Sequence, residues 1–252
     1  MDRKHFIETF KNYVKTFDMD DIQIYLKYEH TLHVAENCNA IAESLGLSEE
    51  DRDIAWETGV LHDIGRFRQV QKYHTFIDAV SVDHAELSAD ILFKEGMIRE
   101  FDKDCENDEL LELAVRQHNK YRLPEGLNER ELLFCRIIRD ADKVDIFRVN
   151  SRVGMDNLYK VPMEEVYESG VTPEVYEFFE KQSTIPRNIM KTIGDHFIGH
   201  CALAWELVYP KSRDLVKKQG YLEEMMNFPT RNPQMKEILK DAREKLTVFL
   251  EQ

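Results

Sequence analysis

The stretch from Trp56 to Phe67 reads Trp-Glu-Thr-Gly-Val-Leu-His-Asp-Ile-Gly-Arg-Phe and places His62 beside Asp63 at the end of an apolar run. An imidazole and a carboxylate in that position offer one nitrogen and two oxygen ligands to a divalent cation. Alone, the pair is weak evidence, because a chain with 9 His and 48 acidic residues can carry a His-Asp dipeptide as a capped or hydrogen-bonded histidine. The other histidines and acids must therefore decide between a metal site and a structural pair.

Two amphipathic helices are expected before this stretch. Residues 3–17 and 21–45 each repeat apolar side chains at helical spacing, which predicts one buried face for each helix. His30 and His33 lie three residues apart on roughly one face of the second helix. Only one of them need be a ligand, and a lone histidine on a half-buried face is more often structural.

The quoted stretch belongs to a helix that opens at Ser48, an N-cap residue with an acid three positions later. Gly59 in this helix permits the close approach of another backbone. Arg66 lies one short turn beyond the acid of the pair, where it could meet the phosphate of a metal-bound substrate or remain a surface arginine. Residues 67–82 mix aromatic and polar types without helical periodicity, which predicts an irregular loop beside the site.

More candidate ligands follow. Asp83 opens a further helix with His84 in its first turn, and His118 ends the helix predicted over 109–118. The next residues form a polar and basic loop that could close over a site. Its candidate substrate contacts are Asn119, Lys120 and Arg122.

Acids interrupt the strongly apolar helix predicted over 129–149. Asp140, Asp142 and Asp145 would each cost several kcal/mol if buried without compensation, so they should be paired or bound to metal. Salt bridges with Arg139, Lys143 or Arg148 could account for two of the three and leave one for chemistry.

Composition sets the class of protein. The 252 residues are 33% charged and 42% hydrophobic with only 10 Gly and 7 Pro, which favours a soluble, helical, globular protein. No apolar run approaches the roughly 20 residues of a membrane helix, and the first residues lack the apolar core of a signal peptide, so a cytoplasmic location without membrane association is expected. The four cysteines form no Cys-x-x-Cys pair and are expected to be reduced core residues.

The net charge of −14 opposes binding of long nucleic acid, because the field of the protein repels polyphosphate. A small anionic substrate could still bind where cations reverse the local sign. Residues 151–252 are less informative, with prolines between short helices and a clear amphipathic helix over 234–250.

Taken together, the order His, His-Asp, His, His, Asp resembles the HD superfamily of metal-dependent phosphohydrolases. The opening element of that family fits His30-Thr-Leu-His33-Val34 and assigns the ligand to His30, with His33 as a neighbour. The resemblance covers roughly residues 25 to 150. The other matching elements are His62-Asp63-Ile-Gly-Arg66, Asp83-His84, Gln117-His118-Asn119 and Ala141-Asp142.

The resemblance implies an all-α fold, an HD-domain helical bundle with a C-terminal helical extension. The bundle would cover residues 1–150, and the extension, residues 151–252, would pack against it as one compact unit. The resemblance also implies two divalent ions bridged by Asp63, and imidazole with carboxylate suits Mn, Fe, Ni, Co or Zn better than Mg. The implied ligands are His30, His62, Asp63, His84, His118 and Asp142.

The implied activity is hydrolysis of a small phosphate ester, possibly a nucleotide, by a metal-activated hydroxide. Asp63, Arg66 and Lys143 would take catalytic roles, and the substrate would contact Arg66, Asn119, Lys120 and Arg122. The related HD-GYP enzymes have two consecutive histidines where this chain has His118-Asn119, and Gly-Tyr-Pro where it has Tyr121-Arg122-Leu123-Pro124, so hydrolysis of a cyclic dinucleotide is not expected. A di-iron oxygenase on the same ligands and a non-catalytic nucleotide sensor remain the alternatives.

Overall fold

The computed structural model describes residues 2–252, and every regular element within them is a helix. The expected all-α fold is confirmed. The chain divides into two compact units, Met1–Asp142 and Lys143–Gln252, and the helix α8 (Glu129–Val153) runs through the boundary. The division at residue 150 and the packing of the extension against the first domain stay predictions.

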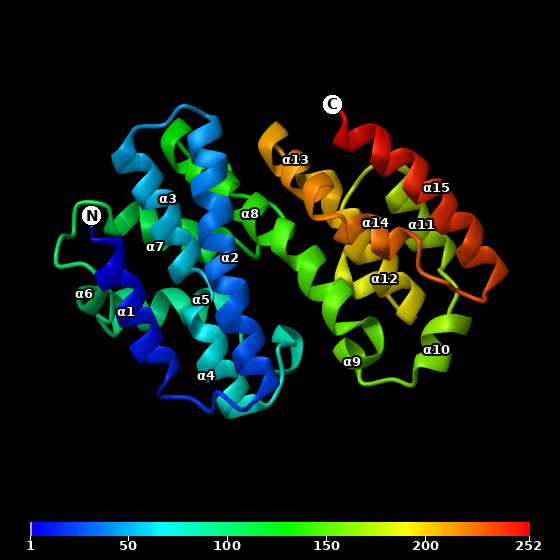
Figure 1. Ribbon diagram of the computed structural model, residues 1–252, viewed down its shortest axis with the longest axis horizontal. Helices are drawn as coiled ribbons and strands as arrows, with labels where there is room; N and C mark the ends of the chain where they lie inside the picture. The colour runs from blue at the N-terminus through cyan, green and yellow to red at the C-terminus, as the bar shows by residue number, and fades with distance from the viewer. Residues whose placement is uncertain (1) are drawn as a thin grey trace. The chain divides into compact units, whose positions relative to one another are not determined.

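The first unit is a bundle built around a long helix, α2 (Ile22–Ser44), which lies antiparallel to α3 (Glu49–Leu61) in Figure 1. Ser48 caps α3 by accepting a hydrogen bond from the backbone N–H of Asp51 at 3.1 Å, as the sequence predicts. The other elements are α1 (Arg3–Val14), α4 (Ile64–Tyr73), the 3-10 turn η1 (Asp78–Val80), α5 (His84–Ala89), the π-helical turn η2 (Asp90–Lys94), α6 (Ile98–Phe101), α7 (Asp108–Gln117) and the first part of α8.

Gly59 is the point of closest approach between α2 and α3. A Cβ atom built on this glycine would lie 2.5 Å from the Cα atom of Ala35 and 2.9 Å from its backbone nitrogen. Only a residue without a side chain fits there, which confirms the close backbone approach predicted at this position. Gly59 lies one turn before His62, so the contact also fixes the position of His62 relative to α2.

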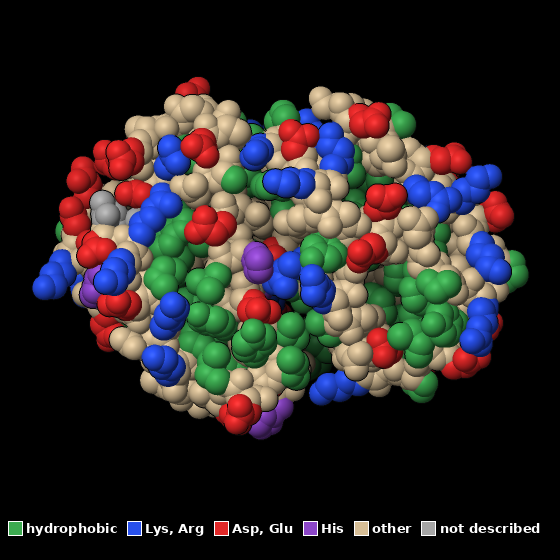
Figure 2. All heavy atoms as spheres, in the orientation of Figure 1, with side chains coloured by type: hydrophobic (Ala, Val, Ile, Leu, Met, Phe, Trp, Pro, Cys, Tyr) green, Lys and Arg blue, Asp and Glu red, His purple; other side chains and the backbone are tan. Residues whose placement is uncertain are grey.

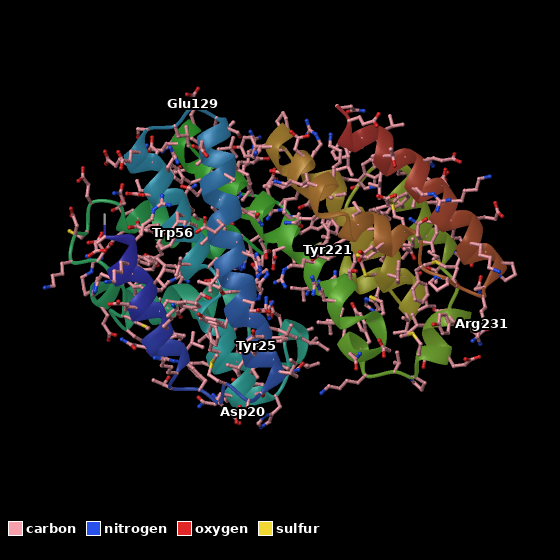
Figure 3. The ribbon with its side chains drawn as sticks, viewed as in Figure 1. Asp20, Tyr25, Trp56, Glu129, Tyr221 and Arg231 are labelled. Atoms are coloured by element: carbon pink, nitrogen blue, oxygen red, sulfur yellow. The ribbon has the colours of Figure 1, made fainter. Side chains whose placement is uncertain are left out.

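Aromatic side chains anchor α1 to the helices that carry the His-Asp pair. Phe6 packs edge-on against Trp56, with ring centroids 5.7 Å apart, and Phe10 packs against Phe67 at 5.9 Å. Figure 3 labels Trp56 on α3. Each of these rings is almost fully buried and contributes on the order of 1.5–3 kcal/mol to folding. These contacts hold α1 against both α3 and α4, the two helices that meet at the His-Asp pair.

The irregular loop expected over 67–82 is wrong in its first part, because α4 continues to Tyr73. Ile64, Phe67 and Val70 are buried at helical spacing. The buried polar residues Arg66 and Gln69 lie between them and obscure the pattern. The Arg66 guanidinium donates to Gln69 Oε1 at 2.7 Å, so each polar group compensates the other inside the protein.

The second unit is a separate bundle with its own apolar core around α12 (Ile193–Ala202), which packs against α9 (Met155–Tyr159), α10 (Met163–Glu168), α11 (Pro173–Glu180), α14 (Tyr221–Met226) and η4 (Leu203–Glu206). The helix expected over 234–250 is confirmed as α15 (Pro233–Leu250). The remaining elements are η3 (Arg187–Ile189) and α13 (Pro210–Gln219).

The structure also bears on what composition predicted about membrane association and the cysteines. Of the helices in residues 2–252, none combines the length and apolar character that a bilayer crossing requires. All four cysteines are free, and Cys105 is exposed rather than part of the core, because it lies in the connection between α6 and α7.

In the first unit, Figure 2 shows hydrophobic side chains gathered over α1 and the N-terminal half of α2, and Tyr25 there is 43% exposed.

Candidate metal centre

Six side chains from five places in the first unit converge on one buried point. His30 comes from the middle of α2, and His62 and Asp63 form the junction between α3 and α4. Asp63 occupies the N-cap position of α4, yet its side chain makes no capping hydrogen bond, so the carboxylate is left to face the histidines. The other three members are His84 at the start of α5, His118 just after α7, and Asp142 in α8.

The two oxygens of Asp63 face different pairs of histidines. Its Oδ2 atom lies 3.6 Å from Nε2 of His30 and 3.5 Å from Nε2 of His62. Its Oδ1 atom lies 3.5 Å from Nε2 of His84 and 3.7 Å from Nε2 of His118. Asp63 is thus shared by two groups of candidate metal ligands, one on each side of its carboxylate.

Asp142 adds a second carboxylate on the side of the first group. Its Oδ1 atom lies 3.1 Å from Nε2 of His30 and 3.9 Å from Nε2 of His62. Asp145, three residues on, is instead paired with Arg148 at 2.7 Å, as the salt-bridge explanation of the acids in this helix expects for some of them. Asp142 is therefore the acid of α8 that reaches the cluster.

Five of the six carboxylate–imidazole distances, 3.5–3.9 Å, exceed the usual hydrogen-bond length of about 2.7–3.2 Å, and only the 3.1 Å between Asp142 and His30 lies within it. Ligands bound about 2.1 Å from one ion lie about 3.0–3.5 Å apart, so most of these atoms are close to the separation that a shared ion would impose. Nε2 of His62 and Oδ1 of Asp63 are buried, and neither has a hydrogen-bond partner among residues 2–252. Such buried atoms cost roughly 1–3 kcal/mol each unless something satisfies them, and a divalent cation would do so.

The outer ring nitrogens are fixed by acceptors. Nδ1 of His62 donates to the carbonyl of Gly59 at 2.8 Å, and Nδ1 of His118 donates to the carbonyl of Val115 at 2.7 Å. A carbonyl can only accept, so each ring carries a proton on Nδ1, and Nε2, which faces the cluster, is the nitrogen available to a metal ion in the neutral ring. His33, one turn from His30, is exposed and is no member of the cluster.

The protonation states of the clustered side chains also favour metal binding. Burial lowers the pKa of His118 to about 3, with help from His84 and His62, and burial together with Arg66 lowers the pKa of His84. Burial alone would raise the pKa of Asp63, but Lys27 and His62 outweigh it and hold that pKa well below its usual range. At neutral pH these two histidines are uncharged and Asp63 is ionised, which are the forms that bind metal.

The predicted substrate contacts lie in different settings. Arg66 is 8% exposed, and its guanidinium lies 3.3 Å from Nε2 of His84, so it faces the cluster rather than the surface. Asn119 also lies beside His84, at 3.5 Å from Nδ1, and donates to Asp83 at 2.8 Å. Lys120 pairs with Asp83 at 2.7 Å.

The remaining two basic candidates contact other groups. The guanidinium of Arg122 lies over the ring of Tyr121, 4.4 Å from its centroid. Lys143 is the first residue of the second unit and pairs there with Glu206 at 2.9 Å. The roles of all five residues toward a substrate stay predictions.

Sequence reasoning missed Asp78 and Lys27. Asp78, in η1, accepts a hydrogen bond from Nδ1 of His84 at 2.6 Å and also accepts from Arg66 at 2.9 Å. Lys27, one turn before His30, donates to Oδ2 of Asp63 at 2.7 Å. Neither stands in a recognisable motif, and one acid among 48 in a segment without periodicity carries no signal of its own.

Replacing Asp78 by asparagine should weaken divalent-metal binding about 10- to 100-fold, because His84 loses the carboxylate that orients its ring and raises its basicity. Titration of the metal-free protein with Mn²⁺ measures the effect. The matched control is Asp90→Asn, which removes an acid paired with Arg116 on the surface of the same unit. Equal Mn²⁺ affinities in the two variants would show that Asp78 does not orient His84.

Comparison with known proteins adds one finding. Residues 28–146 match the family model described as HD domain, a range that includes all six clustered side chains. No curated protein and no solved structure matches the chain.

Proposed function

We propose that this chain, whose residues 28–146 match the HD-domain family model, is a metal-dependent phosphohydrolase of the HD superfamily that hydrolyses a small phosphate ester, with nucleotides as the first candidates. The domain supports the class of reaction. The choice of a small ester rests on charge, because a chain of net charge −14 repels long polyphosphates while a local cluster of cations can still hold one phosphate group.

The observation that carries the proposal is the shared carboxylate of Asp63. One oxygen faces His30 and His62 and the other faces His84 and His118, so these residues, with Asp142, fit a pair of divalent ions. Bound ions would supply a hydroxide nucleophile at neutral pH and offset the negative charge of the phosphate. Imidazole and carboxylate donors favour Mn, Fe, Ni, Co or Zn over Mg.

The protein's own groups around the ions would hold the substrate. Arg66 brings a positive charge beside His84 and is kept in place by Gln69 and Asp78. Asn119, on the other side of His84, offers an amide group. Both can bind phosphate oxygens without displacing a metal ligand, because neither belongs to the cluster itself.

The decisive experiment strips the purified protein of metal, reloads it separately with Mn²⁺, Co²⁺, Ni²⁺, Fe²⁺ or Zn²⁺, and measures phosphate or nucleoside release from generic phosphoesters and nucleotides. Elemental analysis of each sample reports the metal content. We expect uptake of up to two ions per chain and turnover of at least one substrate. A protein that takes up metal but releases nothing from the whole panel would instead fit the nucleotide sensor.

A di-iron oxygenase is the second candidate, because four imidazoles and two carboxylates suit iron as well as they suit hydrolytic metals. Iron in the purified protein with substrate-dependent oxygen uptake would favour it. Hydrolysis needs no oxygen, so turnover under anaerobic conditions would exclude the oxygenase.

A further inference from the structure

We propose that Lys27 competes with a divalent ion for one oxygen of Asp63 and, once displaced, binds the phosphate group of the substrate. The second half of this inference rests on the proposed function. Lys27 precedes residues 28–146, the range matched by the HD-domain model, so the family match says nothing about it.

The competition follows from which atom Lys27 contacts. Its Nζ atom lies 2.7 Å from Oδ2 of Asp63, the same oxygen that faces Nε2 of His30 and His62. An ion held by those two nitrogens needs a lone pair of Oδ2 and would lie close to the ammonium. Like charges at such a distance in a buried site repel strongly, so the ammonium must move away when the ion binds.

Lys27 is placed so that it can move. Its side chain is 18% exposed, whereas those of Asp63, His30 and His62 are at most 2% exposed, so Lys27 lies on the solvent side of the cluster. Its flexible four-carbon stem can swing the ammonium outward without any change in the backbone. The ring of Phe76, with its centroid 5.7 Å from Nζ, offers a second favourable resting place through a cation–π contact.

Arg66 provides the contrast. Its guanidinium also lies near Asp63, with Nε 3.6 Å from Oδ1, but its NH1 group donates to the carbonyl of Phe76 as well as to Gln69 and Asp78. Within residues 2–252 Lys27 has no second carboxylate to hold it. Of the two cations beside Asp63, Lys27 is therefore the one that an ion can displace.

A displaced ammonium at the solvent side is suited to phosphate. It is a compact charge with three donors, and it would stand beside the ions that the phosphate also contacts. The chain's net charge of −14 makes a local positive group at this position valuable, because the substrate is itself an anion. The same residue would then weaken metal binding and strengthen substrate binding.

These opposite effects give the test. Lys27→Met removes the charge and keeps the length of the side chain. We expect the dissociation constant for Mn²⁺ to fall about tenfold, and the dissociation constant of the Mn²⁺-saturated protein for inorganic phosphate to rise about tenfold. Lys27→Arg, which keeps the charge, should bind phosphate within about threefold of the wild type.

The matched control is Lys72→Met, which removes an exposed lysine that lies over Tyr73 in α4 and should change neither constant. Weaker or unchanged Mn²⁺ binding in Lys27→Met would overturn the proposal, and so would unchanged phosphate binding. If Lys27→Met does not fold, nitrogen NMR of the lysine ammonium groups in the wild type decides. The Lys27 signal should shift on addition of Zn²⁺ and again on addition of phosphate. A signal that stays unchanged after both additions would overturn the proposal.

Failure of this inference differs from failure of the proposed function. A wild-type protein that binds Mn²⁺ and hydrolyses a phosphoester, with Lys27→Met unchanged in both constants, would remove only the role of Lys27. A wild-type protein that binds no divalent metal would remove both proposals.

Discussion

Replacing Asp63 by alanine should remove bound divalent metal and hydrolysis together while leaving the helical content largely unchanged. Both groups of histidines share this one carboxylate, so its loss weakens both halves of the site at once. We expect the rate to fall at least about a thousandfold, which corresponds to about 4 kcal/mol of transition-state stabilisation. Elemental analysis, circular dichroism and initial rates on one preparation measure the three quantities.

A buried acid outside the cluster is the control for Asp63. Asp145 is fully buried and ion-paired with Arg148, so Asp145→Asn should lower the free energy of unfolding by about 2–4 kcal/mol while metal content stays at the wild-type value. Asp63→Ala should therefore lose metal while its helical content stays largely unchanged, and Asp145→Asn should lose stability while its metal content stays unchanged. Activity that survives in Asp63→Ala would mean that the nucleophile is generated elsewhere.

The second large effect is expected from Gly59→Ala. The added Cβ atom would lie 2.5 Å from the Cα atom and 2.9 Å from the backbone nitrogen of Ala35. No change of rotamer can move a Cβ atom away from a neighbouring backbone. Helices α2 and α3 must separate, at a cost of about 3 kcal/mol or more in the free energy of unfolding. The same displacement moves His62 away from His30, so Mn²⁺ affinity should fall as well.

Denaturant unfolding and Mn²⁺ titration measure the two consequences of Gly59→Ala. Gly96→Ala serves as the control, since Gly96 has a left-handed backbone with φ of +83° and nothing within 4 Å of an added Cβ atom. That variant should lose only about 1 kcal/mol and keep its metal affinity. If Gly59→Ala were no more destabilised than Gly96→Ala, the tight contact would not control the site.

Some features of the fold and of the site could be predicted from residue types within a few positions of each other. The N-cap at Ser48, the buried faces of α1 and α2 and the helix ending before His118 follow from residue types at local spacing. The choice between His30 and His33 was different, because both lie on a similar face and only the first is buried. There the family resemblance selected a residue that spacing left open.

Other features could not be read because their cause lies in distant partners. The continuation of α4 was hidden because Arg66 and Gln69 are polar yet buried, which makes sense only once their hydrogen bonds to each other and to Asp78 are known. Lys120 looked like a phosphate ligand, and nothing local reveals that Asp83 and Glu86 already hold its ammonium.

The sequence by itself determined that the chain is helical, roughly where α1, α2, α3, α7 and α15 lie, and which kinds of side chain are present to hold a divalent ion. These properties depend on residues within a few positions of each other, and such interactions form in any context that permits the helix. Only the tertiary structure decided that one carboxylate faces four imidazoles, that Asp78 orients one of them, and that Lys27 rests on the shared acid. Those contacts join side chains on different helices, and their distances are set by how the helices pack rather than by the order of residues along the chain.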